Sequence, residues 1–206
     1  MVVALGITDK GIKIPVGFIQ TSSANSRAIG QLLKQIIDQK FSFTDGLLVV
    51  IDGSKGIHKA VTDVFEKKAI IQRCQWHKRE NVLSYLSDRD KSNFKIRIQN
   101  SYREPDYQKA KSTLMNIHKD LVKINHNAAN SLLECLEETL SLHKLKVAQI
   151  FTRSLETISF RKGKKRHLNR LHHFKQKFDK KSWNILTFYL PFGVSLKTKF
   201  KSGFYS

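Results

Sequence analysis

Acidic residues are scarce in this sequence of 206 residues. Asp and Glu number 17 against 37 Lys and Arg, so the formal net charge is +20 and the sequence pI is near 10.1. A chain this basic is expected to meet a polyanion, and nucleic acid is the first candidate. A lysine-rich surface without a specific partner is the alternative reading.

Cysteines and long apolar segments are also scarce. Cys74 and Cys135 are too few for a disulfide framework, which favours a reducing compartment. No apolar run reaches the roughly 18 residues that a membrane span needs, so no membrane partner is expected. The N-terminus lacks a basic segment followed by a long apolar one, so we expect no secretory signal and a cytoplasmic location.

The clearest pattern lies between Gly46 and Arg79. Residues 47–51 form an apolar run rich in β-branched side chains, which is typical of a strand buried on both faces. Apolar residues at helical spacing then predict a helix over 57–64. A second apolar run at 69–71 predicts another strand. The stretch therefore reads as a βαβ unit.

Three polar residues follow these two strands. Asp52 comes directly after the first strand, and Cys74 and His77 come after the second. Because ligands gather at the carboxyl ends of strands in open α/β sheets, these are the candidate catalytic residues. A carboxylate there favours a metal ion as its partner. An Asp-Gly pair after a strand is equally typical of a turn that caps the next helix.

The segment before this unit predicts a hairpin and a helix. Strands are expected over 1–8 and 12–21, with Pro15 at a bulge or a non-donating position. Helical periodicity follows over 28–37, with candidate N-cap oxygens at 21–23. The order β-β-α-β-α-β predicts a mixed sheet with parallel crossovers, and so an α/β fold.

The rest of the chain changes character twice. Helices are expected over 78–86 and 93–98, then from Pro105 to Ile124, and as one stripe from Ala129 to Leu140. We therefore divide the chain into an α/β core (1–85), a helical insertion (86–157) and a basic tail (158–206).

The basic tail carries 13 Lys and Arg and one acid, Asp179, and shows no clean periodicity. Its aromatic residues among lysines suit stacking on single-stranded nucleic acid. A disordered basic arm is the other reading, and no regular element is expected.

Two motifs together resemble the Mutator-type bacterial transposases encoded by insertion sequences. They are the Asp-Gly-Ser-Lys-Gly stretch at 52–56 and the Arg-Cys-Gln-Trp-His-Lys stretch at 73–78, and the resemblance runs from Met1 to about Leu155. It implies an RNase H-like fold with three catalytic carboxylates and a helical insertion. It also implies Mg²⁺-dependent cleavage and transfer of DNA strands at element ends and target DNA, by a protein that can form homo-oligomers. The family's second Asp corresponds to Asp52, a ligand of Mg²⁺, and its Cys-x-x-His signature corresponds to Cys74 and His77.

The sequence departs from the family pattern in two places. The family's first Asp lies on a strand before the segment that matches Met1, which would leave a gap in the sheet. The final Glu position is occupied by Lys162, because the pattern that begins at Arg153 breaks at Ile158. We therefore expect an inactive copy, truncated at its front and frameshifted near residue 158. The alternative is a non-catalytic basic protein that binds nucleic acid.

The second motif does not predict a zinc site, and its His77 and Trp76 are expected to have other roles. Cys74 and His77 alone are too few for a zinc site, so we expect His77 to lie beside the carboxylate or to contact DNA. Trp76 is expected in the core, because a large aromatic contributes most there.

Overall fold

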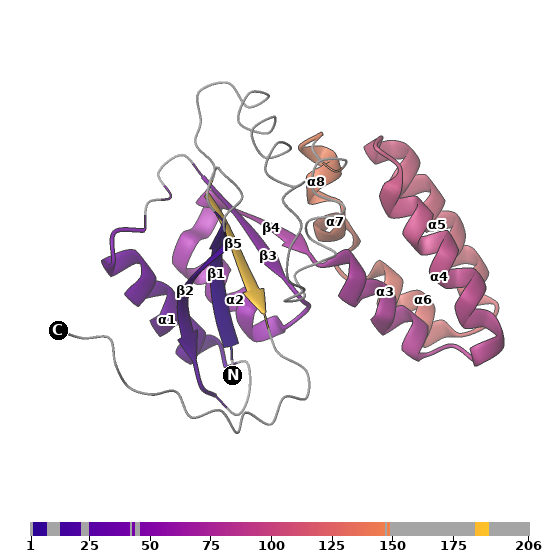
Figure 1. Cartoon of the computed structure of the whole chain (residues 1–206). Coiled ribbons are helices and arrows are strands. Elements are labelled where there is room, and N and C mark those ends of the chain that lie inside the picture. Colours follow the sequence, from indigo (N-terminus) through magenta and orange to yellow (C-terminus); the bar gives the residue numbers. More distant parts are fainter. Residues whose placement is uncertain are drawn as a thin grey trace.

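A five-stranded mixed sheet organises the first part of the protein (Figure 1). The computed structural model describes residues 2–7, 13–21, 25–41, 43, 46–146, 148 and 184–189. The strands are β1 (Val2–Ile7), β2 (Lys13–Ile19), β3 (Leu47–Ile51), β4 (Ala69–Arg73) and β5 (Asn184–Tyr189). Their order across the sheet is β2-β1-β5-β3-β4, antiparallel among β2, β1 and β5 and parallel among β5, β3 and β4. The predicted mixed α/β class is confirmed.

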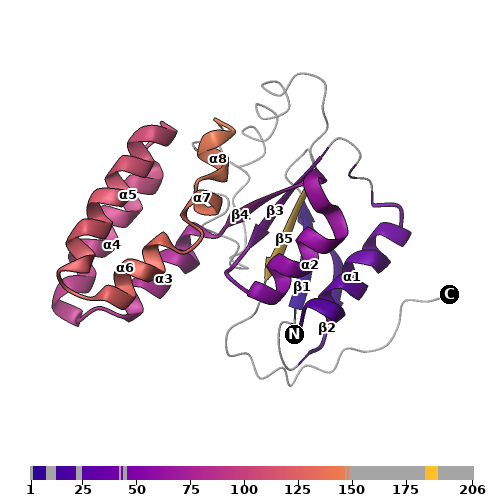
Figure 2. The ribbon, with the colours of Figure 1, turned by 180° about the vertical axis from the view of Figure 1, so that it is seen from behind.

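Two helices cover one face of this sheet, α1 (Ser26–Asp38) and α2 (Lys55–Phe65), and a short 3-10 turn at Glu66–Lys68 follows α2 (Figure 2). Their apolar stripes pack with alternate residues of β1 and β3 in one core. All five residues of β3 are buried, as its continuous apolar run predicted. The N-cap of α1 is Asn25 rather than a residue of 21–23, because the Asn25 side chain accepts from the Arg27 N–H at 2.9 Å.

The hairpin of β1 and β2 contains the predicted irregularity at Pro15. Ala4 lies opposite Gly17 and Leu5 lies opposite Pro15, so Val16 is the extra residue of a bulge. Proline has no N–H to donate to a ladder, and β2 is an edge strand where that loss is tolerated.

Strand β5 was not predicted, and it occupies the middle of the sheet. It pairs with β1 over Val3–Ile7 and with β3 over Leu47–Val50, whereas no pairing joins β1 directly to β3 among the described strands. The expectation of a gap in the sheet is therefore wrong, as is that of a wholly irregular tail. The sequence Asn-Ile-Leu-Thr-Phe-Tyr is rich in β-branched and aromatic residues and has no charge, but six residues are too few to show a decisive periodicity.

Six helices within residues 75–144 form a block beside the β4 edge of the sheet (Figure 1). They are α3 (Gln75–Ser84), α4 (Asp88–Arg103), α5 (Tyr107–Val122), α6 (His126–Leu133), α7 (Leu136–Thr139) and α8 (Ser141–Lys144). None of the helices in these described ranges is long and apolar enough to cross a membrane.

Two details of this helical block correct the sequence analysis. The stripe from Ala129 to Leu140 is divided between two helices, α6 and α7, because Cys135 has a φ of +54° and interrupts the helical path. Pro105 lies just before the N-cap residue Asp106 rather than in the first turn of α5.

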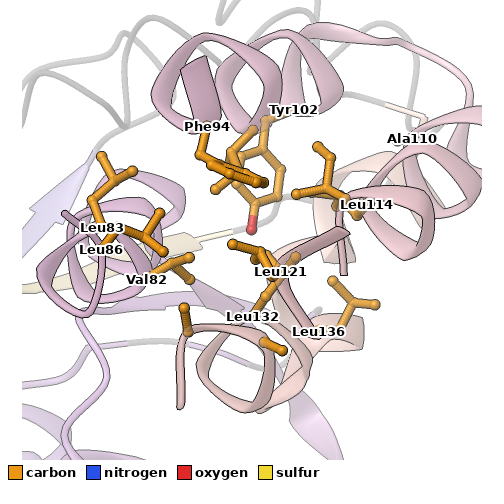
Figure 3. Close-up of a cluster of buried hydrophobic side chains, with 14 of the residues drawn as sticks. Val82, Leu83, Leu86, Phe94, Tyr102, Ala110, Leu114, Leu121, Leu132 and Leu136 are labelled. Carbon is orange, nitrogen blue, oxygen red and sulfur yellow. The ribbon is translucent and has the colours of Figure 1, made fainter. Parts of the chain in front are cut away.

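The helical block has its own apolar core, drawn in Figure 3. Tyr102 is 2% exposed and points into this core, where burial raises the pKa of its phenol. Within the described residues its hydroxyl makes no hydrogen bond. The Thr139 hydroxyl donates to the Leu136 carbonyl at 2.7 Å and opposes part of the rise in the pKa of Tyr102. A buried polar group without a partner destabilises the folded state.

We expect Tyr102→Phe to raise the free energy of unfolding by about 1 kcal/mol, because it removes an unpartnered buried hydroxyl while keeping the ring. Tyr107→Phe is the matched control, since the Tyr107 hydroxyl donates to Glu137 Oε2 at 2.7 Å and its loss should destabilise. Urea unfolding followed by circular dichroism measures both changes. Destabilisation by Tyr102→Phe would show that the hydroxyl has a partner.

Candidate active site

Asp52 lies in the turn between β3 and α2. Its Oδ1 accepts hydrogen bonds from the backbone N–H groups of Gly53 at 2.7 Å and Ser54 at 2.9 Å. The Ser54 hydroxyl in turn accepts from the Ile57 N–H at 3.3 Å and caps α2. The turn reading of this motif is therefore correct, although the cap is Ser54 and not Asp52. No hydrogen bond within the described residues reaches Asp52 Oδ2, which leaves that oxygen for a ligand.

Gly53 is required by this turn. Its φ is +155°, an angle that residues other than glycine rarely adopt. A Cβ at this position would lie 3.4 Å from Arg73 Nη1. The guanidinium of Arg73, at the end of β4, therefore lies beside the backbone that carries Asp52.

His77 lies in the first turn of α3 and close enough to Asp52 to feel its charge. Partial burial lowers the pKa of His77, and the negative charges of Asp52 and Glu80 oppose that change. The Nδ1 atom is buried and has no hydrogen-bond partner among the described residues. The lowered pKa favours the neutral form of the ring at pH 7.

We expect Asp52→Asn to lower the pKa of His77 further. Asp52 and Glu80 both raise this pKa, and the effect of Asp52 is the larger of the two. Glu80→Gln should lower it less. The test is an NMR titration of the His77 ring protons in the wild type and both variants. An unchanged pKa in Asp52→Asn would mean that the two side chains do not interact.

Cys74 and Trp76 complete the second motif. Cys74 is the N-cap residue of α3, and its N–H donates to the Ile51 carbonyl at 2.7 Å, which joins the ends of β3 and β4. Trp76 is 41% exposed, so its predicted place in the core is wrong. Its ring instead contacts His77 edge-on, with centroids 4.7 Å apart.

An ion-pair cluster that sequence analysis did not predict includes Arg73, whose guanidinium lies beside Gly53. Arg73 is 5% exposed, and its Nε donates to Glu138 Oε2 in α7 at 2.9 Å. His58 Nε2 of α2 lies 2.7 Å from Glu138 Oε1, and Arg73 Nη2 lies 3.4 Å from Cys135 Sγ. Glu138 therefore joins the helical block to both the sheet and α2.

The other acids near the end of the helical block are also paired. Glu137 accepts from Lys111, Lys144 and Tyr107, which lower its pKa to about 2. Glu134 lies 3.6 Å from Lys78 Nζ. None of these carboxylates stands beside Asp52 as an unpaired metal ligand.

The described residues do not fit a pair of Mg²⁺ ions. Two-metal sites hold their ions about 3.5–4 Å apart between several carboxylates. Within 2–7, 13–21, 25–41, 43, 46–146, 148 and 184–189, no group of three or more His, Cys, Asp and Glu side chains could hold a metal ion. Strand β5, the neighbour of β3, contains no acid. Glu156 and Lys162 lie outside the described residues.

Comparison with known proteins identifies the family. The family model described as "Transposase, Mutator family" matches residues 1–177, which include Asp52, Cys74 and His77. The match also continues beyond residue 158, where the sequence analysis placed a frameshift. No curated protein in the comparison matches the chain. Because the family model covers most of its length, the chain belongs to the Mutator family of transposases.

Proposed function

We propose that this protein binds DNA in the cytoplasm as a Mutator-family chain, and that it does not by itself perform metal-dependent strand cleavage. The observation that supports this proposal is that Asp52 belongs to no group of three or more possible metal ligands among the described residues. One of its oxygens accepts from the Gly53 and Ser54 N–H groups, and Glu138 is paired with Arg73 and His58. The net charge of +20 supports DNA as the partner.

Without a pair of metal ions, the chain can still bind DNA and orient its polar groups. Asp52 and the neutral ring of His77 can accept hydrogen bonds and place a polar group at the carboxyl end of β3. Basic side chains can neutralise phosphates, which supplies affinity without sequence preference.

Catalysis of transposition is the second candidate. The family membership and the position of Asp52 at the carboxyl end of a central strand both favour it. It requires further carboxylates from a second copy of the chain or from residues beyond the described ones. This second proposal includes the RNase H-like arrangement of strands and helices that the resemblance implies.

One experiment separates the two. Purified full chain is incubated with supercoiled DNA and Mg²⁺, and its DNA affinity is measured at about 50 mM and about 200 mM salt. We expect no nicking, and an affinity that falls about 100-fold or more, as for roughly four phosphate contacts. Nicking that Asp52→Ala abolishes would establish the catalytic candidate instead. Absence of DNA binding at both salt concentrations would refute both.

A further inference from the structure

A polar groove lies between α3 and α6 on the helical block, and its lining includes no residue of the Asp52 turn. Its volume is about 580 Å³, within the range of small-molecule sites. It is lined by Asn81, Ser84, Tyr85, Asn127, Asn130, Ser131 and Glu134. We refer to it as the α3–α6 groove.

The lining residues form two facing stripes. Asn81, Ser84 and Tyr85 are spaced by three and four residues along α3 and its C-cap, so they share one helix face. Asn127, Asn130 and Ser131 have the same spacing on α6, and Glu134 directly follows that helix. The groove is therefore built by the helical repeat and is not a chance gathering of loop residues.

The walls of the groove are fixed at both ends. Lys78 Nζ donates to the Ser131 carbonyl at 2.7 Å, and Asn125 Nδ2 donates to the Tyr85 carbonyl at 3.0 Å. These contacts run in opposite directions along the two helices, which makes the helices antiparallel. Val82 of α3 and Leu132 of α6 are fully buried in the core of the helical block. A wall held in this way loses little conformational entropy when a ligand binds.

The chemistry of the groove differs from that of the chain as a whole. Six of its seven lining residues are polar and uncharged, although the chain carries a net charge of +20. The one carboxylate, Glu134, is paired with Lys78 at 3.6 Å. Phosphates are attracted to lysine and arginine, so this groove offers little to a DNA backbone.

Base edges suit it better. Asparagine side chains present a donor and an acceptor together, the pattern that matches a base edge such as that of adenine. Tyr85 is 49% exposed and offers a ring face at the end of the groove on which a base can stack. A hollow on the protein surface cannot reach the base edges inside the grooves of a duplex. A base that enters the α3–α6 groove must therefore be unpaired.

We propose that the α3–α6 groove binds an unpaired nucleobase of single-stranded DNA. The inference rests on the proposed DNA-binding function and adds a preference for single strands. The basic surface would hold the backbone, and the asparagines and Tyr85 would hold the base.

The test compares single-stranded DNA with the same sequence as a duplex, by fluorescence anisotropy on the full chain. We expect Asn127→Ala/Asn130→Ala to weaken single-strand affinity about tenfold or more, as for the loss of one bidentate base contact. Tyr85→Leu should give about a tenfold loss, from stacking. Duplex affinity and the salt dependence of both should stay within about twofold. Asn100→Ala, at an exposed asparagine of α4 outside the groove, is the control.

The outcomes are distinct. Circular dichroism first confirms that the variants keep the wild-type helix content. Equal losses for single strand and duplex, or losses no larger than for Asn100→Ala, would overturn the groove assignment alone. Wild-type binding to duplex but not to single strands would do the same. A wild-type chain that binds neither form would refute the proposed function, and the groove assignment with it.

Discussion

Thr187→Pro in β5 is expected to lower the free energy of unfolding by about 3 kcal/mol or more, a large share of the roughly 5–15 kcal/mol typical of a domain. Thr187 lies opposite Leu5 in β1 and Val50 in β3. Because the strand is paired on both sides, its N–H groups are used in one ladder or the other, and proline removes a donor. The two strand pairs of the sheet are joined only through β5 among the described strands, so the loss affects the whole sheet.

Thr187→Val is the matched control, since it keeps both the backbone N–H and a β-branched side chain. Urea unfolding of the full chain, followed by circular dichroism, measures both variants. A Thr187→Pro protein as stable as Thr187→Val would mean that β5 is not a central strand of the folded protein.

Glu138→Ala is expected to lower the free energy of unfolding by about 3–5 kcal/mol, the usual effect of leaving a buried charge without its partner. The guanidinium of Arg73 is 5% exposed and loses the carboxylate that its Nε contacts at 2.9 Å. His58 loses its contact as well. Since Glu138 joins α7 to α2 and is one of the links from α7 to β4, beside the Gln72 bond to the Thr139 carbonyl, we also expect looser attachment of the helical block to the sheet.

Glu137→Ala provides the comparison in the same helix. Glu137 pairs with Lys111 and Lys144, but its side chain is 45% exposed. Exposed pairs contribute about 1 kcal/mol or less, so the loss should be correspondingly small. The double variant Arg73→Met/Glu138→Leu should recover most of the lost stability, because it removes the buried charge. Equal effects of Glu137→Ala and Glu138→Ala would contradict the assigned role of Arg73.

Local patterns in the sequence predicted the elements that are decided locally. The apolar run of β3 and the helical stripe of α2 placed Asp52 between them, and both elements are found. Proline at position 15 predicted the bulge. His77 was expected beside the carboxylate, and the effect of Asp52 on its pKa agrees.

The features that were missed depend on residues distant in the sequence. Arg73 and Glu138 are 65 positions apart, and nothing near either residue marks it as a partner of the other. Strand β5 is short, and its place follows from the unfilled pairing capacity of β1 and β3 rather than from its own pattern. Trp76 was assigned to the core by residue type, whereas its position on α3 leaves it 41% exposed.

Metal binding is the direct test of whether Asp52 lacks partner ligands, as it does among the described residues. The full chain and Asp52→Ala are titrated with Mn²⁺, which binds the oxygen ligands that Mg²⁺ prefers and is detected by electron paramagnetic resonance. We predict no stoichiometric Mn²⁺ binding that depends on Asp52. Two Mn²⁺ ions bound per chain, and lost in Asp52→Ala, would show instead that the chain assembles a complete metal site.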